Sequence, residues 1–389
     1  MGFVRSGSSC GLSARSLALV VLALTLAAAG CGEGTGSTFD AGVAPDVPGG
    51  ADTGGVTDDA GPDPDAPAPA DAGRTECPPV PACDAPLPPL GATSPWRHSI
   101  TTPLVTVMGA ARHRGRDLYL RETDEQWALA KFAYGPLDDD LKDEDVDIYL
   151  LRDCGGTWEH LGVATTTDDG AHATVEGVQD TGGRVYFAIP AGARLGLGRH
   201  RLLFVVRGDH TMAEQFIVVL PDTARFVVTD VDGTQTESET AEWTTLLTGT
   251  GPAAQPSGAA MLSAFAARGY HVFYLTARPE WLHTRTHEWL ASEGYPAGSV
   301  HTTLTGTGAL GGAAQTFKED ELGALLARFP ASIEVGIGNT DTDIAAYATV
   351  GLSPERVVSY RFDPGALGTQ VDDYGTLIPV AEAAPLACP

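Results

Sequence analysis

The spacing of apolar residues changes near Thr223, and this change sets the architecture that the chain can adopt. Beyond it, short apolar runs alternate with segments of helical periodicity. The predicted strands cover residues 226–229, 272–276, 333–337 and 356–360, and the predicted helices lie near 259–268, 280–293, 319–328 and 342–350. Strand–helix alternation with right-handed crossovers gives a parallel sheet covered on both faces. We therefore predict an α/β domain with a Rossmann-like sheet over residues 223–389, with its binding site at the carboxyl ends of the strands.

Residues 95–222 show a different pattern, in which short alternating runs are separated by turn residues such as Asp168-Asp169-Gly170. The predicted strands cover residues 127–134, 146–151, 172–175, 184–189, 200–206 and 215–220. Many short strands with frequent turns are typical of an all-β fold. We predict an immunoglobulin-like β-sandwich here.

Two carboxylates, Asp230 and Asp232, follow directly after the buried strand 226–229. Residues separated by one position on an extended segment share a face, so both side chains can address one phosphoryl group and one metal ion. Gly233 permits the sharp turn that aims them, and Thr234 follows it. A calcium loop or an ordinary turn is the alternative, but the preceding apolar strand argues against it.

At this point the sequence resembles a known family. The run DVDGT, extended through Thr236 and Ser238, resembles the first motif of the haloacid dehalogenase superfamily in its lipin-type form, DxDGTxTxS. YLTARP is similar to the lipin-type YLSAR segment, and the following LHTRTHEWL is similar to the next helix of that family. GIGNTDTDIAAYATVGL resembles GNxxxDxxAYxxVG, with Asn339 and Asp343 at the acidic-motif positions. The resemblance covers residues 223–362, and several motifs in the correct order are stronger evidence than one.

The resemblance implies a phosphatase that works through an aspartyl-phosphate. Asp230 would be the nucleophile and Asp232 the general acid and base. Thr276 and Lys318, the latter being the only lysine of this domain, would hold the phosphate oxygens.

The same resemblance implies Mg²⁺ as the cofactor. Its ligands would be the Asp230 carboxylate, the Asp232 backbone carbonyl and Asp343, with Asn339 nearby. Gly233, Thr234 and Arg278 complete the expected site as substrate-binding residues.

The spacing of the motifs bears on the substrate. About forty residues separate Thr234 from Thr276, and a similar number separate Thr276 from Lys318, which leaves no room for a cap domain. A capless site stays open to bulky or membrane-bound phosphomonoesters. Together with the lipin-like motifs, this predicts a phosphoric monoester hydrolase that converts phosphatidate to diacylglycerol and phosphate.

The N-terminal segment 1–31 has the plan of an exported lipoprotein signal. Basic residues precede an apolar run, which leads through Ala29-Gly30 into Cys31. The apolar run is too short to span a bilayer. We expect lipidation at Cys31 and a place in the cell envelope, on the periplasmic face of the outer membrane or at the cell surface.

Residues 32–94 are rich in Gly, Asp, Pro and Ala and have no apolar periodicity, so we expect a flexible tether. Of the six cysteines, Cys77, Cys83, Cys154 and Cys388 remain after the signal and the lipid site are set aside. An even number in an exported chain favours disulfides. We expect Cys77–Cys83 and Cys154–Cys388, although the sequence leaves the connectivity open; a zinc site is the rival, without a histidine at ligand spacing to these cysteines.

The net charge of -26 makes nucleic acid an unsuitable partner. Two alternatives to the phosphatase hypothesis stay open. In one, the domain senses phosphatidate without turnover, as in the related domain of phosphatidylinositol-transfer proteins. In the other, the β-sandwich is the functional part and binds the envelope.

Overall fold

The structure is a computed structural model that describes residues 76–238 and 251–388, all within one structural unit of residues 69–389. The expected signal, Cys31 and residues 32–75 of the expected tether lie outside the described residues. None of the described helices combines the length and the apolar character needed to cross a bilayer.

The first part of the described chain forms two principal sheets and a small hairpin. The three-stranded sheet has the order β1 (Arg114–Gly115), β3 (Trp127–Lys131), β8 (Arg184–Ala188). The five-stranded sheet has the order β2 (Leu118–Arg121), β10 (Met212–Leu220), β9 (Gly198–Val206), β6 (Asp145–Leu151), β7 (Trp158–Thr165). The smaller elements are α1 (Thr101–Thr106), β4 (Ala133–Tyr134), β5 (Asp139–Asp140), η1 (Arg152–Cys154) and η2 (Ala191–Ala193). All pairs in the two principal sheets are antiparallel except β2 with β10.

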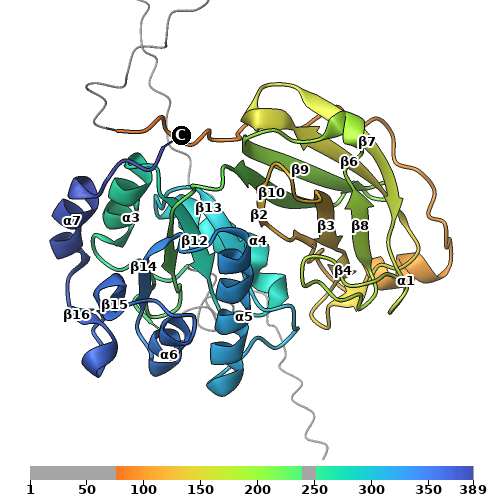
Figure 1. Cartoon of the computed structure of the whole chain (residues 1–389). Helices are drawn as coiled ribbons and strands as arrows, with labels where there is room; N and C mark the ends of the chain where they lie inside the picture. The colour runs from red at the N-terminus through yellow and green to blue at the C-terminus, as the bar shows by residue number, and fades with distance from the viewer. Residues whose placement is uncertain (1–75, 239–250, 389) are drawn as a thin grey trace, which may run out of the picture. The chain divides into compact units, whose positions relative to one another are not determined.

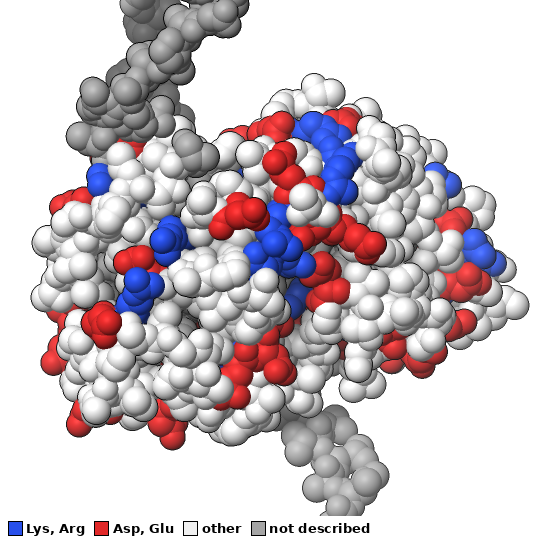
Figure 2. Space-filling view, in the orientation of Figure 1, with Lys and Arg blue, Asp and Glu red and all other residues white. Residues whose placement is uncertain are grey.

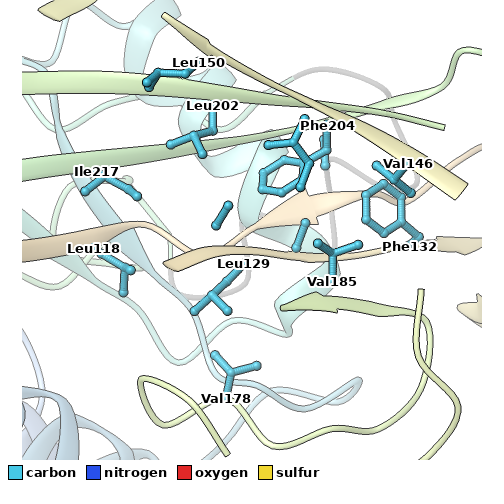
Figure 3. Close-up of a cluster of buried hydrophobic side chains, with 14 of the residues drawn as sticks. Leu118, Leu129, Phe132, Val146, Leu150, Val178, Val185, Leu202, Phe204 and Ile217 are labelled. Carbon is cyan, nitrogen blue, oxygen red and sulfur yellow. The ribbon is translucent and has the colours of Figure 1, made fainter. Parts of the chain in front are cut away.

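Side chains from both sheets meet in one apolar core (Figure 3). Along β6, Val146, Ile148 and Leu150 are fully buried while the residues between them are partly exposed. This two-residue period is what a strand with one covered face requires. Leu129 of β3 lies in the same cluster, so the two sheets pack face to face as a β-sandwich. The finer expectation of an immunoglobulin-like strand order stays a prediction.

The strand predicted at 172–175 is wrong. Glu176 and Gly177 both have positive φ, at 47° and 73°, and the backbones of Val175 and Val178 bond across this turn. A two-residue turn of this kind needs left-handed backbone, so the short alternating run belongs to a tight turn. Conversely, the sequence pattern did not predict β2 or β7. Along β7 no residue is fully buried, so this strand lacks a clear apolar period in the sequence.

The second part of the described chain is a six-stranded parallel sheet with helices. Its strands are β11 (Phe226–Thr229), β12 (His271–Leu275), β13 (Gly298–His301), β14 (Ile333–Gly338), β15 (Val357–Tyr360) and β16 (Thr369–Val371). Its helices are α3 (Gly258–Ala267), α4 (His283–Ser292), α5 (Gly312–Arg328), α6 (Asp341–Thr349) and α7 (Ile378–Ala383), with short turns η3 (Glu280–Leu282), η4 (Pro354–Arg356), η5 (Gly365–Leu367) and η6 (Tyr374–Leu377). The strand order β13-β12-β11-β14-β15-β16 places β11 in the middle of the sheet. A β-sandwich followed by a parallel α/β sheet is therefore confirmed.

Helices cover both faces of this sheet (Figure 1). Val227 of β11 joins a core with α3 and α7, which lie side by side, whereas Phe226 and Val228 join a core with α5 and α6. Burial on both faces explains why β11 is an unbroken apolar run in the sequence. The helix predicted at 319–328 begins earlier, at Gly312.

The two domains share a buried interface. Tyr119, Val218 and Leu220 of the sandwich belong to the same apolar cluster as Phe226 of β11. The Tyr119 hydroxyl donates to the Val272 carbonyl at 2.7 Å. Polar contacts join the domains as well, and they lie close to the carboxyl ends of the strands, as described below.

The expected disulfide pairing is wrong, because Cys77 bonds to Cys388 and Cys83 bonds to Cys154. The stretch between Cys77 and Cys83 reads PPVPA, and proline-rich backbone is extended by about 3.1 Å per residue. Six such steps hold the two cysteines far beyond the ~7 Å that a disulfide tolerates between Cα atoms. Because the segment is extended, Cys77 and Cys83 lie beside different parts of the folded chain, where they bond to Cys388 and Cys154, respectively.

The described end of the segment expected as a tether is bound to the folded part. The carbonyls of Pro81, Cys83 and Pro86 accept hydrogen bonds from Arg199, Arg201 and Trp158, respectively. The backbone N–H of Cys77 donates to the Ala267 carbonyl of the α/β domain. Residues 76–94 thus run over both domains, whereas a free linker was expected there.

Candidate functional site

The expected site residues gather at the carboxyl ends of three adjacent parallel strands. Asp230 follows β11, Thr276 follows β12 and Asn339 follows β14. Because β12 and β14 both pair with β11 in parallel, these three ends lie at one edge of the sheet. Binding at this edge is the general behaviour of open α/β sheets.

Asp230 is the buried centre of the site, with 6% of its surface exposed. Its Oδ1 accepts from Lys318 Nζ at 2.7 Å and its Oδ2 from Thr234 Oγ1 at 3.1 Å. Burial raises the pKa of Asp230 to about 7; Lys318 opposes that shift, while Asp343 adds to it. Gly233 directly follows Asp232 and has a φ of 69°. Glycine adopts this left-handed backbone at low cost, which allows the chain to turn after the two aspartates.

Lys318 projects from α5 and bridges the carboxylates of Asp230 and Asp343. Burial alone would lower the pKa of Lys318, but the two carboxylates outweigh it and raise the pKa. The lysine therefore stays charged at neutral pH.

Asp343 is held at the start of α6. Its Oδ2 accepts from the backbone N–H groups of Asn339 and Thr340 at 3.0 and 3.1 Å, and Thr340 caps the helix in return. Although burial opposes it, Lys318 lowers the pKa of Asp343. Gly338 must be small, since a Cβ there would lie 2.3 Å from the Asp343 Cβ. These contacts fix the carboxylate so that its other oxygen faces Lys318.

Asp232 faces a different partner. Arg278 donates to both of its oxygens, from Nε at 2.9 Å and from Nη2 at 2.8 Å, and Thr276 Oγ1 donates at 3.0 Å. Such a bidentate pair is a strong, oriented contact. In this arrangement Arg278 and Thr276, expected at the phosphate, both donate to Asp232, whereas the hydrogen bonds of Lys318 go to Asp230 and Asp343.

A pocket of about 250 Å³ opens over these groups. Asp230, Asp232, Arg278 and Lys318 line its polar part. Its apolar part consists of Ala277, Pro279, Leu282, Ala309, Leu310 and Ala314. The Leu310 side chain at this pocket is 91% exposed, which is unusual for a large apolar residue and suits contact with an apolar surface.

The oxygen atoms fit a hard divalent cation. Asp230 Oδ1 and Asp343 Oδ1 converge on one point, which the Lys318 ammonium group occupies, so a cation bound by both oxygens would require Lys318 to move aside. The Asn339 amide oxygen lies nearby, because Thr234 Oγ1 is 2.6 Å from it and 3.1 Å from Asp230 Oδ2, and the single hydroxyl hydrogen serves one of these two acceptors. Carboxylate and amide oxygens are ligands that Mg²⁺ accepts. The Asp232 side chain is held by Arg278, so only its backbone carbonyl is a candidate ligand.

Sequence reasoning missed Glu280, which stands two residues after Arg278 and ties the site to the sandwich. Arg184 donates to both of its oxygens, at 2.8 and 3.0 Å, and Arg114 donates at 3.0 Å. These three side chains are almost fully buried. A glutamate directly after TARP was visible in the sequence, but its partners lie far away in the chain.

Two family models match the chain. Residues 227–360 match the model described as PITM 1-3, LNS2 domain, and residues 111–219 match PITM 1-3, beta-sandwich domain. The LNS2 domain is of the haloacid dehalogenase-like, lipin-like type, so this match agrees with the superfamily that the motifs indicated. Both matches follow the order of the two domains in the structure.

Curated relatives match this chain over part of their own, longer chains. Protein retinal degeneration B of Drosophila melanogaster is 30% identical over 281 residues, 72% of this chain and 20% of that protein. Membrane-associated phosphatidylinositol transfer protein 2 of Mus musculus is 30% identical over 257 residues, covering 64% and 17%. Membrane-associated phosphatidylinositol transfer protein 1 of Homo sapiens is 29% identical over 255 residues, covering 63% and 18%. The chain thus spans about a fifth of the length of these relatives.

Proposed function

We propose that the LNS2-like domain binds the phosphate group of phosphatidate at a membrane surface. The names of the relatives support a phospholipid at a membrane, since they are membrane-associated phosphatidylinositol transfer proteins. The pocket supports a phosphomonoester, because a buried lysine and an arginine stand at its base and an exposed leucine at its edge. The juxtaposition of Lys318, Arg278 and Leu310 in one pocket is the observation that carries the proposal.

Charge explains why Mg²⁺ belongs to the proposal. Three carboxylates, Asp230, Asp232 and Asp343, face only two cations, Lys318 and Arg278, through the contacts given above. When Asp230 is ionised, the excess negative charge would repel a phosphate dianion in this buried place, and with its pKa raised by burial to about 7 it is ionised in only part of the molecules at neutral pH. A divalent cation held by Asp230, Asp343, Asn339 and the Asp232 carbonyl would add positive charge to the site and would supply charge stabilisation to the phosphate.

Hydrolysis of the bound phosphatidate is the second candidate, and the presence of both Asp230 and Asp232 favours it. In the first step, an Asp230 oxygen bonds to phosphorus, the ester P–O bond breaks, and Asp232 gives its proton to the leaving glycerol oxygen. In the second step, Asp232 takes a proton from water, whose oxygen bonds to phosphorus and releases Asp230 and inorganic phosphate. Asp232 must leave Arg278 for either proton transfer, so binding and turnover are separable.

A vesicle experiment tests binding. The full chain with Cys31→Ser is sedimented with phosphatidylcholine vesicles that contain phosphatidate, or phosphatidylserine at equal surface charge, with Mg²⁺ or with a chelator. We expect Mg²⁺-dependent binding that prefers phosphatidate, and about 10- to 100-fold weaker binding for Lys318→Met, since a charge-assisted hydrogen bond contributes about 1.5–3 kcal/mol. Lys142→Met, on the sandwich, is the matched control. Equal binding to both vesicle types, or no effect of Lys318→Met, contradicts the proposal.

Phosphate release from the same vesicles decides between sensing and hydrolysis. Release that disappears in Asp230→Asn, while vesicle binding remains, supports the phosphatase. Binding without release in the unaltered chain supports the sensing function that the relatives' names favour.

We also propose that Cys31 carries a lipid that holds the protein in the cell envelope. A covalent lipid offsets the repulsion between an anionic membrane and a chain of charge -26. On the face shown in Figure 2, acidic and basic side chains of the described residues are interspersed, so this face has no single-sign area that would recruit the protein. Metabolic labelling with an alkyne fatty acid, lost in Cys31→Ser, is the expected result; equal labelling of both chains contradicts it.

A further inference from the structure

A second cluster of ligand-type side chains lies between the two domains, apart from the pocket described above. Asp117 comes from the link between β1 and β2 of the sandwich, and His283 and His287 come from α4 of the α/β domain. One carboxylate oxygen and one nitrogen of each ring all lie within 4.8 Å of one another. Asp117 Oδ2 is 2.7 Å from His287 Nε2 and 3.9 Å from His283 Nε2.

His283 is the independent observation that points to a ligand. It is 3% exposed, and both of its ring nitrogens lack a hydrogen-bond partner among the described residues. A buried imidazole normally satisfies both nitrogens, because each unpaired polar atom costs about 1–3 kcal/mol. The contact between His287 and Asp117 explains those two groups but leaves His283 unexplained.

The backbone around the cluster is already arranged. His283 and His287 are four positions apart on one helix, so their side chains share a face. The Asp117 carboxylate is fixed by the backbone N–H groups of Phe216 at 2.9 Å and Val300 at 3.0 Å. Such supporting hydrogen bonds orient the carboxylate ligands of metal sites.

We propose that Asp117, His283 and His287 bind a divalent transition metal ion, with zinc as the best match, at the interface between the domains. Two imidazole nitrogens and one carboxylate oxygen are a donor set that zinc accepts, whereas Mg²⁺ and Ca²⁺ prefer oxygen alone. Tetrahedral zinc with bonds of about 2.1 Å separates its ligand atoms by about 3.4 Å. The two distances to Asp117, 2.7 and 3.9 Å, lie on either side of this value, so small side-chain rotations suffice.

The neighbouring charges permit the ion. Arg116 and His301 act electrostatically on His283, and Arg199 acts on Asp117, while Glu321 pairs with Arg116 at 2.5 Å and offsets part of this positive charge. The ion would join β1–β2 of the sandwich to the first turn of α4, directly after the turn η3 that borders the phosphate pocket. It would therefore clamp the two domains behind that pocket. This proposal does not depend on the proposed function.

Direct metal binding tests the site. The full chain, purified with a tag that contains no histidine and freed of metal by a chelator, is titrated with Co²⁺ and then with Zn²⁺. We expect one equivalent of Co²⁺ to give visible absorption bands, which Zn²⁺ removes, and we expect Zn²⁺ to raise the thermal midpoint. Substoichiometric uptake by the unaltered chain overturns the proposal without any variant.

Variants locate the site. We expect His287→Gln and Asp117→Asn to lose the Co²⁺ bands, while His172→Gln, a partly exposed histidine of the sandwich, keeps them. Asp343→Asn keeps them as well, which separates this site from the proposed Mg²⁺ site. His287 is partly exposed, so its replacement preserves the fold better than that of buried His283. Unchanged bands in both His287→Gln and Asp117→Asn overturn the assignment.

Discussion

The replacement Glu280→Gln tests how firmly the sandwich holds the loop that carries Arg278. Glu280 is buried, and although burial opposes the shift, Arg114 and Arg184 lower its pKa from 4.5 to about 2. A shift of this size corresponds to about 3 kcal/mol of stability above pH 4.5. Removing one partner of a buried ion pair typically costs about 3–5 kcal/mol, because the other charges stay buried. We therefore expect Glu280→Gln to lower the free energy of unfolding by about 3 kcal/mol at neutral pH.

The pH dependence gives the sharper test. The pKa of Glu280 is lower in the folded protein, so its stabilisation is present above the unfolded value of 4.5 and is lost as the pH falls towards about 2. The difference between the unaltered chain and Glu280→Gln should shrink over that range. Urea unfolding followed by tryptophan fluorescence measures it, with the exposed Glu288→Gln on α4 as the control. A loss below about 1 kcal/mol, or a difference independent of pH, refutes the reasoning.

The remaining predictions concern the pocket and the covalent links. Asp230→Asn should reduce any phosphate release to background in a phosphate assay, because the amide is no nucleophile; activity that persists would assign the nucleophile elsewhere. Asp343→Asn should remove the Mg²⁺ dependence of vesicle binding, and binding that still responds to Mg²⁺ would place the ion at other ligands. Leu310→Asp should weaken binding to phosphatidate vesicles about tenfold, since burying a leucine contributes about 1.5–3 kcal/mol, yet spare binding of a water-soluble short-chain phosphatidate; equal losses for both would mean that Leu310 does not touch the bilayer. Replacing Cys77 and Cys388 by serine should lower the free energy of unfolding by about 4–5 kcal/mol in urea, as expected for a long loop, and an unchanged midpoint would speak against that bond.

Local sequence was sufficient where neighbours in the chain decide the structure. β11 is predicted with its observed bounds because a buried parallel strand reads as an unbroken apolar run. The turn after it places Asp230 and Asp232 on the expected segment, and Gly233 has the left-handed backbone that such a turn uses. The order of strands and helices then brings Lys318, Asn339 and Asp343 to the same edge of the sheet.

Contacts between distant segments could not be predicted in this way. Asp232 was expected to act beside Asp230, yet its carboxylate pairs with Arg278, because a guanidinium can reach both oxygens in one plane. The disulfides follow the path of the extended segment over both domains, which cysteine spacing does not show.

By itself, the sequence determined the two domain types and placed the motif residues at one edge of the sheet, since periodicity and motif order are local properties. The tertiary structure alone decided which side chains meet across the interface. Asp117 is separated by 166 positions from His283, and only docking of the sandwich on α4 brings the two within 3.9 Å. Which side chains pair across the interface depends on how the two folded domains pack against each other. This packing is determined by the shape and burial of many residues together.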